Sequence, residues 1–186
     1  MKQELNAAGL RLLFEIDTKD YITDGTVTRR PSVRGIIVSE GRLAMVHCLK
    51  YDYCKFPGGG IEAGETHEQA LLREVREETG LTVLPESIKP YGLVRRIQKG
   101  YHEDIFLQEN YYYFCAVSGA ESAQSLDDYE ADERFTLTYL SAAAAIGINR
   151  THPHGDKQND PQLPVMLERE NRVLTMLLTE YPAVFA

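Results

Sequence analysis

An amphipathic helix signal over residues 66–80 is the feature that most constrains the fold. Thr66 and Gln69 have the spacing of a capping box, in which each side chain accepts a hydrogen bond from the other residue's amide. Gly80 stands where a left-handed C-terminal cap is expected. The positions that face the core recur within a stripe about 100° wide, at Leu71, Leu72, Val75 and Thr79. The sequence therefore predicts a helix that begins near His67 and packs one face into a core.

Three glutamates share one face of that helix. Glu74, Glu77 and Glu78 are spaced i, i+3, i+4, next to the apolar stripe. Like charges at this spacing destabilise a helix by roughly a few tenths of a kcal/mol, and carboxylates in its last turns oppose the helix dipole by roughly 0.3–1 kcal/mol each. Two interpretations stay open. The face is solvated and its repulsion is tempered by Arg73 and Arg76, or the three carboxylates bind a divalent cation that prefers oxygen ligands, as Mg²⁺ does.

A run of three glycines, Gly58 to Gly60, precedes the helix. Such a run is typical of a tight turn, and it also lets backbone atoms approach a metal ion or a phosphate closely. The spacing between the glycines and the helix is more specific than either signal alone. Gly59, five residues, Glu65, seven residues and then the segment Arg73 to Leu81 resemble the complete Nudix box, and Phe56 to Gly59 resembles the usual lead-in of that family.

The fold that this resemblance implies is an α/β/α sandwich with a mixed β-sheet between helices. Apolar runs bounded by turn residues predict strands at 11–16, 33–38, 43–48, 91–97, 110–117 and 135–140. Glu40-Gly41 predicts a hairpin between the second and third of these strands. The tyrosines at 111–113 favour strand packing over a platform for a nucleobase, because alternate residues face opposite sides of a sheet.

The remaining patterns complete a single domain. They predict a short helix at 141–146, an exposed loop at 149–162 and a C-terminal helix at about 163–180. We expect one Nudix hydrolase domain over residues 1–186, with its box at 59–81.

The resemblance also implies roles for individual residues. The metal ligands would be one backbone carbonyl and three carboxylates, at Gly58, Glu74, Glu77 and Glu78. The resemblance also allows Glu74 to act as a base. Arg73 would orient these carboxylates, and Glu65 would support the metal site less directly. The implied cofactor is Mg²⁺, for which Mn²⁺ can substitute, and its chemistry is the activation of water for attack on phosphorus.

Downstream of the box the pattern is less specific. Family members often use a further carboxylate as general base, and Glu133 is our first choice, with Glu103 and Glu130 as open alternatives. A small basic cluster follows the box at Arg95, Arg96 and Lys99. Contact with substrate phosphates is one interpretation of this cluster, and plain surface solvation is the other.

Composition limits the partners. The chain is 43% hydrophobic and 26% charged, with a formal net charge of −8, which argues against a large footprint on nucleic acid or on an anionic membrane. Three scattered cysteines and the lack of a long apolar run favour a reducing, cytoplasmic location. We expect a small phosphorylated metabolite as the partner, with no nucleic acid and no membrane, and the resemblance also admits a homodimer.

Three functions are considered. The first is Mg²⁺-dependent hydrolysis of a diphosphate linkage in a nucleoside diphosphate derivative or a nucleoside triphosphate. The second is a Nudix-fold module that binds a nucleotide or metabolite and regulates without catalysis, which the intact box glutamates disfavour. The third is isomerisation of isopentenyl diphosphate with Cys54 as an acid or base, which the complete hydrolase box and the absence of tryptophan disfavour.

Overall fold

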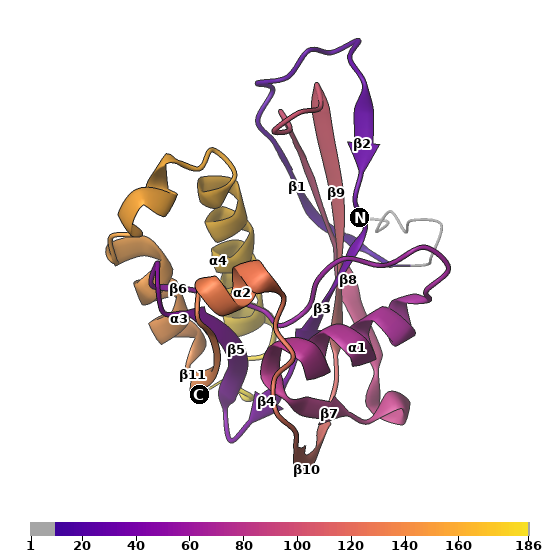
Figure 1. Ribbon diagram of the computed structural model, residues 1–186. Helices are drawn as coiled ribbons and strands as arrows, with labels where there is room; N and C mark the ends of the chain where they lie inside the picture. Colours follow the sequence, from indigo (N-terminus) through magenta and orange to yellow (C-terminus); the bar gives the residue numbers. More distant parts are fainter. Residues whose placement is uncertain (1–9, 186) are drawn as a thin grey trace.

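The computed structural model describes residues 10–185 and has an α/β/α arrangement, as predicted (Figure 1). Its larger sheet is mixed and five-stranded, with strands β1 (Leu12–Asp17), β8 (Lys89–Gln98), β9 (Ile105–Phe114) and β2 (Val27–Arg29) in spatial order and β3 (Ser32–Ile36) also paired with β9. β8 and β9 are antiparallel, whereas β1 runs parallel to β8, and β2 and β3 run parallel to β9.

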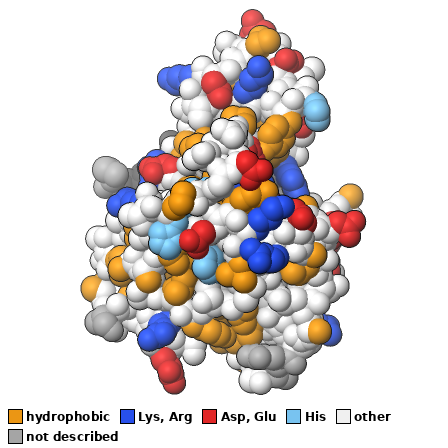
Figure 2. All heavy atoms as spheres, turned by 60° about the vertical axis from the view of Figure 1, so that its left-hand side comes forward, with side chains coloured by type: hydrophobic (Ala, Val, Ile, Leu, Met, Phe, Trp, Pro, Cys, Tyr) orange, Lys and Arg blue, Asp and Glu red, His pale blue; other side chains and the backbone are white. Residues whose placement is uncertain are grey.

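Two smaller sheets accompany it. In the four-stranded sheet, β5 (Arg42–Cys48) is central and pairs antiparallel with β11 (Phe135–Leu140), β4 (Val38–Ser39) and β6 (Tyr53–Lys55). A two-stranded ladder joins β7 (Leu81–Val83) to β10 (Val117–Glu121). The distal ends of the strands of the large sheet project from the body, and in Figure 2 they stand above it as a narrow part that carries both acidic and basic side chains.

Helices cover both sides of the sheets. α1 (His67–Thr79) lies on one side, and α3 (Ala142–Thr151) and α4 (Leu163–Glu180) lie on the other, with the short α2 (Asp128–Asp132) and the 3₁₀ turns η1 (Pro85–Ser87) and η2 (Gly155–Asn159) between elements. The tyrosine run divides between these layers. Tyr111 and Tyr113 pack in the core beneath α1, and Tyr112 packs in the core beneath α3 and α4. The strand-packing interpretation of these tyrosines is therefore confirmed.

Helix α1 begins and ends as its sequence predicts. The Thr66 hydroxyl accepts from the Gln69 amide at 3.2 Å, and the Gln69 side chain accepts from the Thr66 amide at 2.9 Å. Gly80 follows the last turn in the left-handed conformation, with φ 76°. These caps fix the register of the helix and hence the direction in which its glutamates point.

The strand predicted at 33–38 is two strands in different sheets. β3 pairs with β9, and the chain then crosses at Ile37 to form β4, which pairs with β5 across a turn with positive φ at Glu40 and Gly41. The predicted hairpin is therefore present, but its first strand, β4, has only two residues. Apolar character alone predicted a continuous strand, because residues on both sides of the crossing are buried or half-buried.

The loop predicted at 149–162 is largely ordered into helical turns. α3 continues to Thr151, beyond the predicted end at 146, and η2 follows. Asn149 explains the difference, because its side chain donates to the Cys54 carbonyl at 3.0 Å and accepts from the Cys54 amide at 2.7 Å. This polar residue therefore anchors α3 to the edge of β6, whereas its polarity alone predicts a position exposed to solvent.

The glycine loop lies against β3, and at Gly58 its backbone takes a conformation that only glycine adopts easily. The Val33 amide donates to the Gly59 carbonyl at 3.0 Å, and the Gly35 amide donates to the Pro57 carbonyl at 2.8 Å. Gly58 has φ 132°, and a Cβ at this residue would lie 2.2 Å from the Val33 carbonyl oxygen. Because that neighbour is strand backbone, the contact cannot be relieved by a side-chain rotation.

We expect Gly58→Ala to lower the free energy of unfolding by about 3 kcal/mol or more, because strain and a backbone clash add together. Gly64→Ala is the matched control, since Gly64 also has a positive φ of 87° but nothing lies within 4 Å of its Cβ position. It should lose only about 1–2 kcal/mol. Urea unfolding followed by circular dichroism measures both, and equal losses would show that the approach to β3 contributes nothing.

Candidate active site

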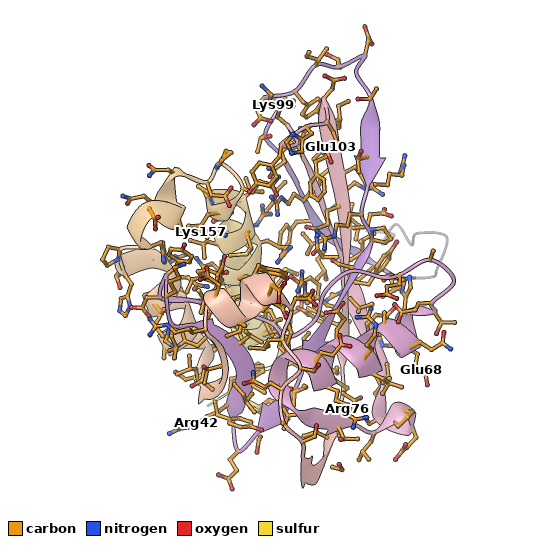
Figure 3. The ribbon with its side chains drawn as sticks, in the orientation of Figure 1. Arg42, Glu68, Arg76, Lys99, Glu103 and Lys157 are labelled. Atoms are coloured by element: carbon orange, nitrogen blue, oxygen red, sulfur yellow. The ribbon has the colours of Figure 1, made fainter. Side chains whose placement is uncertain are left out.

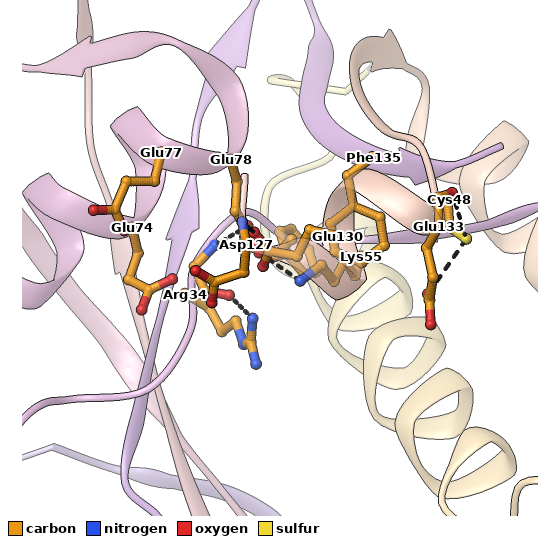
Figure 4. Close-up of polar contacts among 12 residues, drawn as sticks. Arg34, Cys48, Lys55, Glu74, Glu77, Glu78, Asp127, Glu130, Glu133 and Phe135 are labelled. Carbon is orange, nitrogen blue, oxygen red and sulfur yellow. Dashed lines mark hydrogen bonds and ion pairs between the residues drawn. The ribbon is translucent and has the colours of Figure 1, made fainter. Parts of the chain in front are cut away.

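Glutamates of α1 meet acidic residues of α2 across a cleft of about 330 Å³, which we call the acidic cleft. Its lining comprises Arg30, Gly60, Ile61, Glu62, Arg73, Glu74, Glu77, Asp127 and Glu130. Figure 4 shows the carboxylates of Glu74 and Asp127 facing each other across this space. Helix α1 places its acids here through the i, i+3 spacing, and the short helix α2 brings the opposing acids from a segment some fifty residues later in the chain.

Glu74 lies directly against the glycine loop. A Cβ on Gly59 would stand 2.2 Å from one carboxylate oxygen of Glu74, so the missing side chain makes room for that carboxylate. Burial raises the pKa of Glu74 above its ordinary value, although hydrogen bonding from Arg73 opposes the rise. The box glycine therefore shapes the acidic cleft as well as the turn.

Arg73 ties the glutamates to the loop. Its Nη1 donates to Glu74 at 2.8 Å and to Glu77 at 3.1 Å, and its Nη2 donates to the Gly60 carbonyl at 3.0 Å. The other edge of the guanidinium holds Glu65 through two bonds of 2.7 and 2.8 Å. These contacts are of the kind expected for a residue that orients carboxylates.

The Glu78 side chain and the Gly58 backbone groups bond to partners inside the protein, and neither residue lines the acidic cleft. The buried Glu78 carboxylate pairs with Lys55 at 2.5 Å and accepts from the Gly58 amide at 2.8 Å. The Gly58 carbonyl accepts a hydrogen bond from Arg34. The structure thus brings together two of the three predicted ligand glutamates, and the third closes an internal ion pair.

The donor set of the acidic cleft fits a hard divalent cation, which takes carboxylate oxygens. Glu62, Glu74, Glu77, Asp127 and Glu130 all line it, against two arginines. Burial, followed by the nearby charge of Glu78, raises the pKa of Glu130. Over residues 10–185, however, no three acidic, histidine or cysteine side chains lie close enough to form a ready-made metal cluster.

The candidate general bases lie in three different places. Glu130 is buried and lines the acidic cleft. Glu133 is also buried, but it faces a second cleft, where it accepts from Tyr53 and Lys157 at 2.7 Å each. Figure 4 shows its side chain beside Cys48, away from Glu74 and Glu77. Glu103 lies at the projecting end of the large sheet, away from α1 (Figure 3).

The second cleft, of about 260 Å³, is the basic cleft. Its cationic lining residues are Arg30, Arg34, Lys55, Arg96, Lys157 and Arg169. Of the cluster predicted from sequence, only Arg96 belongs to it. Arg95 points to the other face of β8 and pairs with Glu15 and Glu109, and Lys99 is exposed at the projecting end (Figure 3). The predicted cluster is therefore not one group in space.

Sequence reasoning did not single out several site residues. Arg34 and Lys55 belong to no cluster in the sequence, and Asp127 belongs to an acidic stretch, 126–133, that does not show which of its acids faces α1. Only the folded chain brings these residues to the two clefts. Cys54, considered above for isomerase chemistry, is fully buried, and burial raises the pKa of its thiol to about 12. A thiol in that setting is a poor acid or base.

The chain belongs to the Nudix family, because the family model described as NUDIX domain matches residues 28–157. This match confirms the resemblance that the box indicated. Among solved structures, the mutator MutT protein of Bacillus halodurans is similar in fold, with a TM-score of 0.51 at 20% identity, covering 72% of this chain and 82% of that one.

Curated relatives are similar over shorter stretches. An RNA pyrophosphohydrolase of Xanthomonas campestris pv. campestris (strain B100) is 29% identical over 115 residues, which is 56% of this chain and 55% of the relative. An RNA pyrophosphohydrolase of Halorhodospira halophila is 45% identical over 69 residues, 36% of each chain. The chain spans about half the length, or less, of the curated relatives that it matches. Separately, none of the helices within residues 10–185 combines the length and apolar character needed to cross a membrane.

The ion pair between Glu65 and Arg73 leads to a pH prediction. Hydrogen bonding from Arg73 lowers the pKa of Glu65 from 4.5 to about 2. Because the folded state holds this carboxylate ionised, its contribution to stability is present above the ordinary pKa and is lost as the pH falls toward the lowered one. Glu65→Gln should therefore destabilise the protein by about 1–2 kcal/mol at pH near 7.

The difference between wild type and Glu65→Gln should shrink as the pH falls below 4.5 and nearly vanish near 2. Urea unfolding of both proteins across this range measures it, with the exposed Glu68→Gln as control for the loss of one charge. A difference that stays constant down to the acid end would mean that Arg73 does not stabilise the ionised form.

Proposed function

We propose that this Nudix chain is a divalent-metal-dependent pyrophosphohydrolase that cleaves a diphosphate linkage in a nucleoside diphosphate derivative or a nucleoside triphosphate. The acidic cleft is the observation that carries the proposal. It combines the box glutamates Glu74 and Glu77 with Asp127, the N-cap of α2, and Glu130 of α2, and Arg73 holds the box pair. The cofactor would be Mg²⁺, for which Mn²⁺ can substitute.

The chain's own residues have distinct tasks in this proposal. Glu74 and Glu77, with Asp127 opposite, would hold the ion. When bound, such an ion neutralises the diphosphate and activates water. Arg73 keeps the box carboxylates in place, as its hydrogen bonds to both indicate. The proposed metal roles of Glu78 and Gly58 would additionally require release from Lys55 and Arg34.

We further propose Glu130, in preference to Glu133, as the acceptor of the proton from the attacking water. Glu130 lines the acidic cleft, and its raised pKa suits a group that accepts a proton near neutral pH. Glu133 is held by Tyr53 and Lys157 in the other cleft.

RNA ends are the second candidate substrate. The curated relatives are named RNA pyrophosphohydrolases, whereas the chain here has a net charge of −8 and was predicted to bind no nucleic acid. That exclusion, the cytoplasmic location and a homodimer remain predictions. The alternative of a regulatory binding module without catalysis is disfavoured because all box carboxylates are present.

The first test replaces one cleft carboxylate. Glu77→Gln should lower hydrolysis of diphosphate compounds by about 100-fold or more, because one oxygen charge at the metal position is lost. Wild-type turnover should also stop when EDTA removes divalent ions. Release of phosphate or pyrophosphate from a panel of nucleoside triphosphates and nucleotide sugars, with and without Mg²⁺, measures both effects.

Glu77 suits this test because its side chain is 39% exposed, so the variant should fold. Glu68→Gln, on the exposed first turn of the same helix, is the matched control and should keep wild-type activity. Hydrolysis that persists in Glu77→Gln, or that needs no divalent ion, would rule out the proposed mechanism. Binding of these compounds without turnover by the wild type would favour the regulatory module.

A second pair of variants separates the candidate bases. Glu130→Gln should lower kcat by about 100-fold with KM little changed. A glutamine there can still accept from the Asp127 amide, as Glu130 does at 3.0 Å, so α2 should persist. Glu133→Gln should lower kcat much less. Steady-state kinetics across pH provides the measurement, and the reverse order of effects would restore Glu133 as the base.

A further inference from the structure

The basic cleft concentrates positive charge in an acidic protein. Six cationic side chains line it, whereas its acidic lining residues are Glu133 and Asp160. Three of the cations are paired with carboxylates, since Lys55 contacts Glu78, Lys157 contacts Glu133, and Arg169 contacts Glu170. Because these pairs are already neutralised, the charge available to a ligand comes from the other three.

Those three are Arg30, Arg34 and Arg96, and none of them forms an ion pair with a carboxylate of residues 10–185. Two of the three are buried, since Arg34 is 7% exposed and Arg96 is 4% exposed. A buried charge without a counter-charge destabilises a protein by several kcal/mol. The arrangement therefore has a cost in stability that an anionic ligand would offset.

The hydrogen bonds of these arginines leave donors for such a ligand. Arg34 donates to the Gly58 carbonyl, and its buried Nε has no hydrogen-bond partner among the described residues. Within residues 10–185, Arg96 donates only to neutral oxygens, those of the Gln98 side chain at 2.7 Å and of the Gln162 side chain and backbone carbonyl at 3.0 and 3.5 Å. Burial, followed by the neighbouring charge of Arg169, lowers the pKa of Arg96 to about 9, and the charges of Tyr101 and Asp160 offset only part of this fall.

The basic cleft adjoins the acidic cleft. Arg30 lines both, and the neighbouring residues Tyr129 and Glu130 of α2 line one cleft each. Arg30 can therefore contact a ligand that extends from the box glutamates into the basic cleft. The planar guanidinium groups of arginine suit phosphate oxygens, which they bind in pairs.

We propose that the basic cleft binds a phosphate group outside the scissile linkage, so that the preferred substrate is a small organic polyphosphate with three or more phosphates. This inference rests on the proposed diphosphate hydrolysis and narrows it. It favours nucleoside triphosphates and longer polyphosphate compounds over two-phosphate compounds such as ADP-ribose. The main determinants are Arg30 and Arg96, with Arg34 at the floor beside the glycine loop.

The test uses binding without turnover. Isothermal titration of the full chain with inorganic tripolyphosphate, in EDTA, reports on the basic cleft while the metal chemistry is absent. Arg96→Gln and Arg30→Gln should each weaken binding about tenfold, the effect of one lost charge-assisted contact. Arg95→Gln is the matched control, because it removes the adjacent arginine on the opposite face of β8, and it should change the affinity less than about twofold.

Several outcomes would overturn the proposal. One is an equal loss in Arg95→Gln, and another is unchanged affinity in both test variants. Arg30 is exposed, so Arg30→Gln keeps the test decisive even if Arg96→Gln does not fold. A short 5′-triphosphorylated RNA is titrated in parallel. If only the RNA loses affinity in Arg96→Gln, the cleft binds an RNA backbone and not a small polyphosphate.

Kinetics distinguish a failure of this inference from a failure of the proposed function. With Mg²⁺ present, Arg96→Gln should lower kcat/KM about tenfold for a nucleoside triphosphate and much less for ADP-ribose. If the wild type hydrolyses diphosphates but Arg96 affects neither binding nor this ratio, only the inference fails. If tripolyphosphate binding depends on Arg96 but no compound is hydrolysed, the proposed function fails and the anion site stands.

Discussion

The structure of both clefts depends on how the glycine loop is held from two sides. The Phe56 amide donates to the buried carboxylate of Glu170 on α4 at 3.0 Å, and the Gly58 amide donates to the buried carboxylate of Glu78 on α1 at 2.8 Å. Each carboxylate has its own cation, Arg169 and Lys55 respectively. Since breaking a buried ion pair leaves an uncompensated charge, the loop, the two helices and the two cations form one interdependent unit.

This unit also separates charge. The ion pair between Lys55 and Glu78 connects the two clefts, because Lys55 lines the basic cleft and Glu78 follows Glu77, which lines the acidic cleft. A chain with a net charge of −8 can thus present a local positive surface to a phosphate while keeping a cluster of carboxylates for a cation. The Glu78 carboxylate pairs with Lys55 and accepts from the Gly58 amide inside the protein. These contacts explain why Glu78 is buried, whereas the side chain of Glu77, one residue earlier, is 39% exposed.

Local patterns predicted the helix and its caps, because every determinant of α1 lies within fifteen residues. They also predicted the two-sided packing of the tyrosines, because alternation is a property of any strand. The same alternation explains the error at Arg95 and Arg96. Two arginines that are adjacent in the sequence suggest a cluster, but on β8 their side chains lie on opposite faces of the sheet. Arg34 has no such local pattern, and the acidic stretch at 126–133 does not show that Asp127 is the residue that faces Glu74, since only tertiary contacts bring these residues to α1.

The spacing of Glu130 and Glu133 in the sequence does not show which cleft each of them lines. Residues three apart in a helix share a face, so sequence alone cannot separate these two acids. In the structure α2 ends at Asp132, Glu133 is its C-cap, and Arg134 has a positive φ of 56°. The chain turns away at this cap, and contacts from Tyr53 and Lys157 draw Glu133 toward the basic cleft. The short helix α2 and its C-cap therefore place Glu130 and Glu133 in two chemically opposite sites.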